Sequence, residues 1–402
     1  MPQIQSRMFR FPWTLTDNPI GWVEITDSCN IDCRGCYRRR MEGHKSLVEI
    51  EAEIRFMQRY RNVDQINLAG GEPLVHPQIV DIVRFIHDIG LKPCIISNGH
   101  RLKKPGLLEN LKEAGLEHIS FHVDSGQIRP GWTGKSEEEL NALREFLSDK
   151  IHAAGGIKCG FNMTVTRSNL DHIPRMVRWA LSRRGRVTGL TFIVLRGGVL
   201  REGYTYLALG RPVALPADAL GYLSDEATRG EYVYATDVRD VLQKNFPRYQ
   251  PAAYLGGSVR SESLKWIVSQ TICSGDEMLG AAGPRAIELF QSAYHYLFGR
   301  YSLGTRRPLG RTAFGMALFD RGTRQALWQW IRRGPFFRRV YGLALAIVQP
   351  PDELPDGTFE MCDGCPDMTY FQGKLVHSCR LDEYRQFGSL LSQVPAQPVQ
   401  TP

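Results

Sequence analysis

Apolar residues in the first half of the chain alternate between short continuous runs and stretches of helical periodicity. The short runs predict six buried strands: Gly21–Thr26, Gln65–Ala69, Lys92–Ser97, His118–Val123, Cys159–Val165 and Gly189–Leu195. The periodic stretches predict five helices: Val48–Tyr60, His76 to about Gly90, Leu107–Ala114, Ser136–Leu147 and Asn169–Ser182. Strands that alternate with helices pair in parallel, so we expect an α/β fold with a barrel-like sheet and ligands at its carboxyl edge.

The pattern changes after about Leu200. Residues 200–282 lack clear alternation, whereas Thr323–Arg333 and Phe336–Val348 each predict a helix, separated by Gly334-Pro335. We therefore expect residues 201–350 to be mostly helical. The predicted divisions are an N-terminal arm (1–20) with aromatic anchors at Phe9, Phe11 and Trp13, a barrel (21–200), the helical region (201–350), a small C-terminal module (351–390) and a disordered, Gln- and Pro-rich tail (391–402).

Composition places the chain among soluble globular proteins. It has 402 residues, of which 43% are hydrophobic and 23% charged. Six of its nine cysteines fall into two tight clusters, which is typical of metal ligands in a reducing compartment. Neither a signal-peptide core at residues 1–19 nor an apolar run of ~18 residues is present, so we expect a cytoplasmic protein.

Positive charge is concentrated in residues 283–348. This stretch has eleven arginines, no lysine, twelve aromatic residues and only Glu288 and Asp320 as acids, and its net charge of +9 exceeds the +8 of the whole chain. Arginines interleaved with aromatics suit a membrane interface or another anionic partner, and they also suit RNA or single-stranded nucleic acid. The alternative is a helical subdomain with a solvated arginine face.

Three cysteines, Cys29, Cys33 and Cys36, follow the first predicted strand. Three thiolates within eight residues can face one inorganic centre, one ligand short of the four that a closed iron–sulfur cluster or zinc site usually takes. The open position is where a small molecule could bind and react. A zinc site is the alternative, but zinc knuckles favour paired C-x2-C units.

The spacing C-x3-C-x2-C, followed by Tyr37, resembles the signature of the radical S-adenosylmethionine (SAM) superfamily. The resemblance implies a partial (β/α)6 TIM-like barrel and a [4Fe-4S] cluster on the three cysteines, with SAM on the fourth iron. It implies that the reduced cluster splits SAM into methionine and a 5′-deoxyadenosyl radical, which abstracts a substrate hydrogen. An external electron donor such as flavodoxin or ferredoxin follows from the same resemblance.

The resemblance also points to residues that would contact SAM, all of them near the ends of predicted strands. Tyr37 matches the aromatic position beside the adenine, and Gly70-Gly71-Glu72-Pro73 matches the element that binds the methionine amino group. The remaining candidates are Ser97, Asn98, Asp124, Asn162 and Arg167. Each has a plain alternative, since tight turns, helix caps and packing use the same residue types. Cys94 and Cys159 are expected to be core residues.

A second cluster of cysteines lies near the C-terminus at Cys362, Cys365 and Cys379, with a predicted hairpin turn at Gln372–Leu375 between them. The segment resembles the SPASM or twitch module that holds an auxiliary [4Fe-4S] cluster in radical SAM enzymes. A zinc ribbon would need a second C-x2-C pair. Either Cys273 supplies the fourth ligand, or an open iron binds substrate.

The sequence leaves the substrate open. The first hypothesis is a lipid or other hydrophobic molecule at the inner face of the membrane, suggested by residues 283–348. The others are peptide maturation and modification of a nucleotide or RNA. No residue is assigned a catalytic role beyond cluster and SAM binding.

Overall fold

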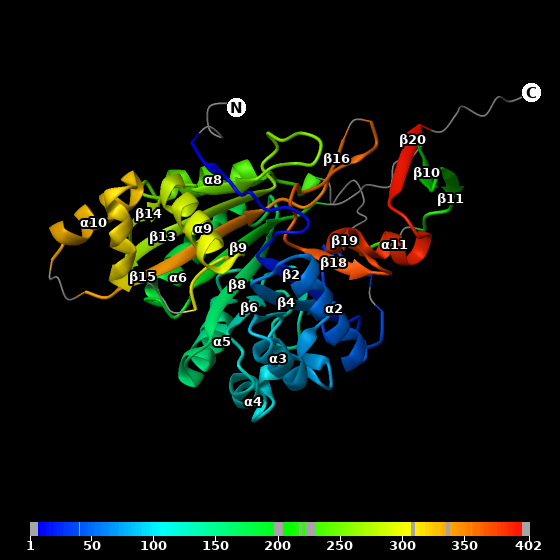
Figure 1. Cartoon of the computed structure of the whole chain (residues 1–402), viewed down its shortest axis with the longest axis horizontal. Helices are drawn as coiled ribbons and strands as arrows, with labels where there is room; N and C mark the ends of the chain where they lie inside the picture. The colour runs from blue at the N-terminus through cyan, green and yellow to red at the C-terminus, as the bar shows by residue number, and fades with distance from the viewer. Residues whose placement is uncertain are drawn as a thin grey trace, which may run out of the picture.

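The structure is a computed structural model that describes residues 7–39, 41–196, 204–216, 219–221, 230–306, 310–334, 338–354 and 356–395. Its centre is one large curved sheet with strand order β1-β12-β13-β15-β9-β8-β6-β5-β4-β2, and β14 pairs with β13 (Figure 1). The mixed α/β fold predicted from the sequence is confirmed.

Six parallel strands form the barrel part of this sheet: β2 (Ile20–Thr26), β4 (Gln65–Gly70), β5 (Lys92–Ser97), β6 (His118–His122), β8 (Lys158–Val165) and β9 (Gly189–Val194). They are the six predicted strands, with ends that differ by one residue. Short apolar runs identify them because both faces of such a strand are covered.

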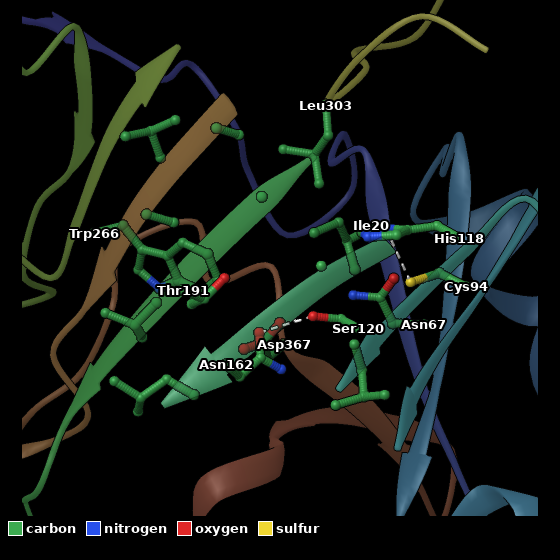
Figure 2. A pocket seen from close by; sticks show the side chains of 18 of the residues that line it. Ile20, Asn67, Cys94, His118, Ser120, Asn162, Thr191, Trp266, Leu303 and Asp367 are labelled. Atoms are coloured by element: carbon green, nitrogen blue, oxygen red, sulfur yellow. Dashed lines mark hydrogen bonds between the residues drawn. The ribbon is translucent and has the colours of Figure 1, made fainter. Parts of the chain in front are cut away.

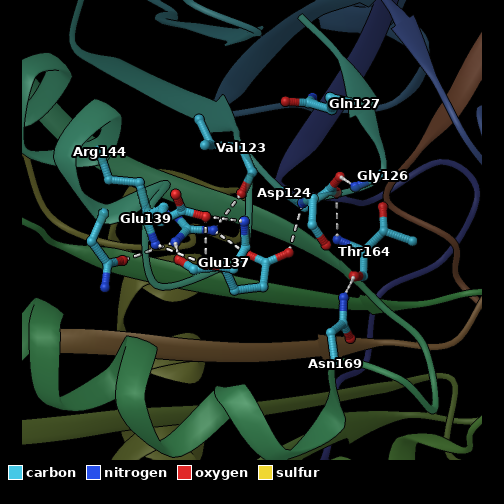
Figure 3. A network of polar contacts seen from close by, with 12 residues as sticks. Val123, Asp124, Gly126, Gln127, Glu137, Glu139, Arg144, Thr164 and Asn169 are labelled. Carbon is cyan, nitrogen blue, oxygen red and sulfur yellow. Dashed lines mark hydrogen bonds and ion pairs between the residues drawn. The ribbon is translucent and has the colours of Figure 1, made fainter. Parts of the chain in front are cut away.

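Helices cover the outer face of the barrel strands: α2 (Leu47–Tyr60), α3 (Ile79–Asp88), α4 (Leu107–Glu113), α5 (Asn141–Ala154) and α6 (Ile173–Ser182). Four of the five predictions overlap these closely, but α5 begins five residues after the predicted Ser136. A turn at 137–140 precedes the helix, and in it Glu137 pairs with Arg144 and accepts a hydrogen bond of 2.7 Å from the amide of Ser125 (Figure 3).

The prediction of a mostly helical region at 201–350 is wrong. The strands β12 (Ala253–Leu255), β13 (Trp266–Ser274), β14 (Glu277–Ala282) and β15 (Val340–Val348) extend the barrel sheet beyond β9. β15, within the range predicted as a second helix, pairs in parallel with β9 and antiparallel with β13. Leu343, Leu345 and Ile347 are buried, and the residues between them are less buried. This period of two is that of a strand, not of the predicted helix. Phe336 and Phe337 lie outside the described residues.

Helices in this region are α8 (Ala235–Asn245), α9 (Pro284–Phe298), the 3-10 segment η4 (Gly310–Leu318) and α10 (Arg321–Arg332). α10 confirms the helix predicted at Thr323–Arg333, and Asp320 caps it by accepting a 2.8 Å hydrogen bond from the amide of Thr323. α9 crosses the sheet, and α10 lies beyond β14 (Figure 1).

The C-terminal module contains β16 (Asp352–Glu353), β17 (Phe359–Glu360), β18 (Met368–Phe371), β19 (Lys374–His377) and α11 (Leu381–Phe387). The predicted hairpin turn is confirmed, with Gln372 at φ 45° and Gly373 at φ 85° between β18 and β19. The predicted disordered tail begins instead as a strand, β20 (Leu391–Pro395), which pairs with β10 (Tyr204–Ala208); β11 (Arg211–Val213) pairs with β10 in turn. Residues 396–402 lie outside the described residues.

The N-terminal arm packs onto the sheet as expected. β1 (Phe9–Arg10) pairs with β12, and the rings of Phe11 and Trp13 stack 4.0 Å apart between centroids. Remaining short elements are the strands β3 (Asp32–Cys33) and β7 (Gln127–Ile128) and the 3-10 turns η1 (Pro73–Val75), η2 (His100–Lys103), η3 (Leu170–His172) and η5 (Ser378–Arg380).

Candidate active site

One chamber of about 1410 Å³ occupies the hollow of the curved sheet, and all six clustered cysteines line it. Alternate residues of the strands face inward, for example Asn67 on β4, Ser120 on β6 and Asn162 on β8 (Figure 2). The extension contributes to the same chamber, with Trp266 on β13 and Ala346 on β15. The barrel and the region after it therefore enclose a single space.

The two walls of this chamber differ in chemistry. The barrel wall is polar, and Ser120 donates a 2.9 Å hydrogen bond to Asn162 there (Figure 2). The extension wall is mostly apolar and small, formed by residues that include Val268, Ile272, Ala344, Ala346 and Val348. A ligand in the chamber would meet hydrogen-bonding groups on one side and hydrocarbon on the other.

The loop that carries Cys29, Cys33 and Cys36 is held by the glycine pair at the end of β4. The amide of Gly71 donates to the carbonyl of Thr26 over 2.8 Å, and the amide of Glu72 donates to the carbonyl of Ser28 over 2.9 Å. A Cβ on Gly71 would lie 2.3 Å from the carbonyl oxygen of Ser28. Only glycine permits this approach, so Gly70-Gly71 fixes the cysteine loop as well as lining the chamber.

Glu72 lines the chamber beside Gly70 and Gly71, and its carboxylate is already hydrogen-bonded within the protein. Its carboxylate is buried and accepts hydrogen bonds from the Ser97 hydroxyl (2.6 Å) and from the amides of Asn98 (2.7 Å) and Leu74 (3.0 Å). Burial raises the pKa of Glu72, and these hydrogen bonds oppose that rise. The carboxylate thus ties the loop after β4 to the end of β5.

The other predicted SAM contacts divide into two groups. Tyr37, Ser97, Asn98 and Asn162 line the chamber, whereas Pro73, Asp124 and Arg167 do not.

Asp124 is buried against His122 and the amides of Thr164 and Gly126, at 2.7, 2.9 and 3.0 Å (Figure 3). Burial alone would raise its pKa, but His122 and these hydrogen bonds outweigh it and lower the value. Arg167 donates to the carbonyls of Gly230 and Tyr232. Both residues hold loops, which was the alternative reading of their sequence positions.

Cys362, Cys365 and Cys379 come together at the chamber wall. The thiols of Cys362 and Cys365 are in hydrogen-bonding contact, and this contact, together with burial, raises the pKa of Cys365 well above its usual value. Burial and the neighbouring Cys362 likewise raise the pKa of Cys379. Arg61 and Asn18 hold the segment from the barrel side by donating to the carbonyls of Cys365 and Gly364.

Cys273 does not join them, which corrects the prediction of a fourth cysteine ligand. Cys362 forms a β-bridge with Gly257, beyond the Trp266 end of β13, while Cys273 lies near the opposite end of that strand. Seven residues at about 3.3 Å each separate Trp266 from Cys273 by roughly 23 Å. Cys273 is a buried core residue that contacts the Thr271 hydroxyl at 3.3 Å. Cys94 and Cys159 are also buried, as expected.

A charged clamp that sequence reasoning missed joins the first cysteine loop to the C-terminal module. Arg38, two residues after Cys36, is buried against Glu24 and Asp27, and its Nε lies 3.5 Å from Asp382 on α11. Arg385 completes the clamp with a 2.7 Å contact to Asp27. Sequence gave no signal for it, because Arg38 and Asp382 are far apart along the chain.

The donor sets fit iron–sulfur clusters. Each triad offers three thiols, the ligand type that iron–sulfur clusters take, and each borders a space large enough for a bound molecule. In the described ranges, no group of three or more His, Cys, Asp or Glu side chains is gathered for a single metal ion.

Comparison with known proteins points to one superfamily. The profile of the radical SAM superfamily matches residues 23–180. A tungsten-containing aldehyde ferredoxin oxidoreductase cofactor-modifying protein from Pyrococcus furiosus is 25% identical over 175 residues, covering 40% of this chain and 48% of that protein. A probable GTP 3′,8-cyclase from Saccharolobus solfataricus is 24% identical over 258 residues, covering 63% of this chain and 76% of that protein.

Among solved structures, SuiB from Streptococcus suis bound to its precursor peptide SuiA aligns with 57% of this chain and 46% of that chain, at a TM-score of 0.41 and 14% identity. The chain spans about half the length of the Pyrococcus furiosus protein. Residues 23–180 therefore form a radical SAM domain, the domain that defines the radical SAM superfamily of SAM-dependent iron–sulfur enzymes.

Proposed function

We propose that this chain cleaves SAM at a [4Fe-4S] cluster held by Cys29, Cys33 and Cys36 and abstracts a hydrogen atom from a hydrophobic substrate in the chamber. When bound, the cluster supplies the electron that splits SAM into methionine and the 5′-deoxyadenosyl radical. The backbone of Gly70 and Gly71 would bind the methionine end, since it lies directly beside the cysteine loop. Tyr37, Asn98 and Asn162 would bind the rest of SAM from the polar wall.

The substrate class is inferred from apolar residues that lie between the outer surface and the chamber. Five large apolar residues on and after α9 line the chamber and are also exposed: Leu289 (42% exposed), Leu297 (69%), Phe298 (60%), Leu303 (45%) and Phe319 (59%). They form an apolar rim where a chain of hydrocarbon could pass from outside to the inner wall. A polar substrate would gain nothing from such a rim.

The surroundings of this rim suit an anionic lipid surface. Arg285, Arg311, Arg321, Arg324 and Arg332 are exposed on α9, η4 and α10. Exposed apolar residues flanked by arginines favour binding to the interface of an anionic membrane. No helix within the described residues is long and apolar enough to cross a membrane. We propose peripheral binding, with α9 and η4 against the lipid.

Cys362, Cys365 and Cys379 would hold a second [4Fe-4S] cluster in a SPASM- or twitch-like module. Their shared position at the chamber wall supports this proposal, because such a cluster would face the same space as the first. A flavodoxin or ferredoxin would deliver electrons from outside.

The test uses anaerobically reconstituted protein. With dithionite as reductant we expect 5′-deoxyadenosine to form from SAM, and its absence would contradict the proposed chemistry. Flotation with vesicles of phosphatidylcholine and phosphatidylglycerol should recover the protein, with less recovery from phosphatidylcholine alone. A salt-dependent RNA gel shift without flotation would favour nucleic acid instead, and stimulation of SAM cleavage only by peptides would favour peptide maturation.

A further inference from the structure

The second triad of cysteines leaves one ligand position unassigned. Three thiolates occupy three irons of a [4Fe-4S] cluster. Cys273 is too far away, as β13 separates it from the module by roughly 23 Å. Any fourth protein ligand must come from side chains beside the triad.

Asp367 has such a side chain. It lies between Cys365 and β18, and it faces the chamber (Figure 2). The main causes that raise the pKa of Cys365 and Cys379 are the neighbouring Cys362 and burial, and the charge of Asp367 adds to the rise at both thiols. Its backbone carbonyl accepts a 3.0 Å hydrogen bond from the amide of Ser378, the residue before Cys379, so its position is tied to that ligand.

The carboxylate of Asp367 is unpartnered within the part of the chain that the structure describes. Arg61 is the nearest basic group acting on it, but the guanidinium of Arg61 is used by the carbonyls of Leu15, Ile20, Cys365 and Pro366. Asp367 is only partly exposed to solvent, and a carboxylate in that position without a hydrogen-bond donor gains stability from a cation that binds it. A cluster iron would satisfy it.

Three other side chains near the triad could in principle bind iron. The ring of His377 uses one nitrogen for the backbone of Cys362 and keeps the other, so His377 is the rival of Asp367. Asp363 is about half exposed and pairs with Arg10, and Glu360 accepts from the amide of Val259 at 2.8 Å and from Arg260. Asp367 is thus the one carboxylate of this set that makes neither an ion pair nor a side-chain hydrogen bond within the described residues.

We propose that Asp367 is the fourth protein ligand of the auxiliary cluster and closes it. This inference rests on the proposed function, which places a cluster at Cys362, Cys365 and Cys379. A closed cluster would act in electron transfer or in shaping the chamber, and substrate would not bind its iron.

The experiment uses full-length protein in which Cys29, Cys33 and Cys36 are replaced by Ala, so that only the auxiliary cluster contributes a signal. In this background, Asp367→Ala should change the electron paramagnetic resonance spectrum of the reduced cluster, and air exposure should convert it to a three-iron form much faster. Asp367→Cys should restore four irons per chain and resistance to air. Asp363→Ala is the matched control and should leave spectrum and iron content unchanged.

The outcomes distinguish failure of the auxiliary-cluster proposal from failure of Asp367 as its ligand. If the background protein binds no iron while circular dichroism shows it folded, the auxiliary cluster itself is wrong. If it holds about four irons and Asp367→Ala gives the same spectrum and air sensitivity as Asp363→Ala, then Asp367 is not a ligand, and the fourth iron is either bound by His377 or open. Should Asp367→Ala fail to fold, Asp367→Asn gives the same comparison with nearly unchanged volume.

Discussion

The two walls of the chamber differ in how their strands are arranged and in the polarity of the residues that face inward. The barrel wall, β2 to β9, is a run of parallel strands joined by helices, and its inward residues are polar near the cysteine loop. The extension wall, β15 to β12, is largely antiparallel, and its inward residues are small or apolar. Under the proposed function, the polar wall would bind SAM and the cluster, and the apolar wall would bind the substrate.

The largest effect is expected on the barrel side. Replacing Cys29, Cys33 and Cys36 by Ala should abolish 5′-deoxyadenosine formation and remove about four irons, because these thiols are the proposed ligands of the SAM-binding cluster. Cys273→Ala, which removes a buried thiol from the extension wall, is the control and should keep full iron content. Residual cleavage of SAM by the triple variant would contradict the assignment.

A smaller but still large effect should follow from Gly71→Ala. The new Cβ would lie 2.3 Å from the carbonyl oxygen of Ser28, so the cysteine loop must shift. A misplacement of about 1 Å can lower a rate about a hundredfold, and we expect a loss of that order in SAM cleavage. Gly43→Ala, where a Cβ meets nothing within 4 Å, tests the same loop without the clash, although its φ of 135° makes some strain inevitable. If the two variants had equal activity, the close approach of Gly71 to Ser28 would not be what positions the cysteine loop.

A larger side chain on the extension wall should lower conversion of the substrate and leave SAM cleavage nearly unchanged. Ala346→Phe adds a ring to the inward face of β15. We expect product formation from a hydrophobic substrate to fall about tenfold, while 5′-deoxyadenosine formation without substrate stays within about twofold of the unmodified protein. Measuring both products in one reaction distinguishes the walls. A parallel loss of both would show that they do not act separately.

The smallest effect is expected at the apolar rim. Leu297→Ser should weaken binding to anionic vesicles about fivefold, which corresponds to roughly 1 kcal/mol of lost apolar burial. Val48→Ser changes a side chain that is 77% exposed on α2, on the barrel, and should leave vesicle binding unchanged. Flotation of equal amounts of the two variants is the measurement, and equal recovery would argue against α9 as the lipid-binding face.

The barrel wall was predictable because its signals are local. A buried strand is a short apolar run, an amphipathic helix has its own period, and three cysteines within eight residues need no long-range contact to be recognised. The turn at Gln372-Gly373 was likewise readable, because the favoured type of hairpin turn needs positive φ at both positions.

The extension wall was not predictable from the sequence, because its strands form only through pairing with distant segments. β15 is a strand between β9 and β13, a position that its own residues do not reveal. Glu72 shows the same limit at the site, since only folding brings Ser97 and Asn98 to its carboxylate.

The sequence by itself thus determined the superfamily signature, the six barrel strands and the two cysteine clusters. Tertiary structure alone decided that both groups of cysteines face one chamber and that Cys273 is remote from Cys362. It also decided that Asp367 lies beside the C-terminal cysteines. The physical reason is that spacing along a chain constrains only neighbouring residues. Distances between segments depend on strand pairing and on buried contacts such as Arg61 with Cys365, which form between residues far apart in the sequence.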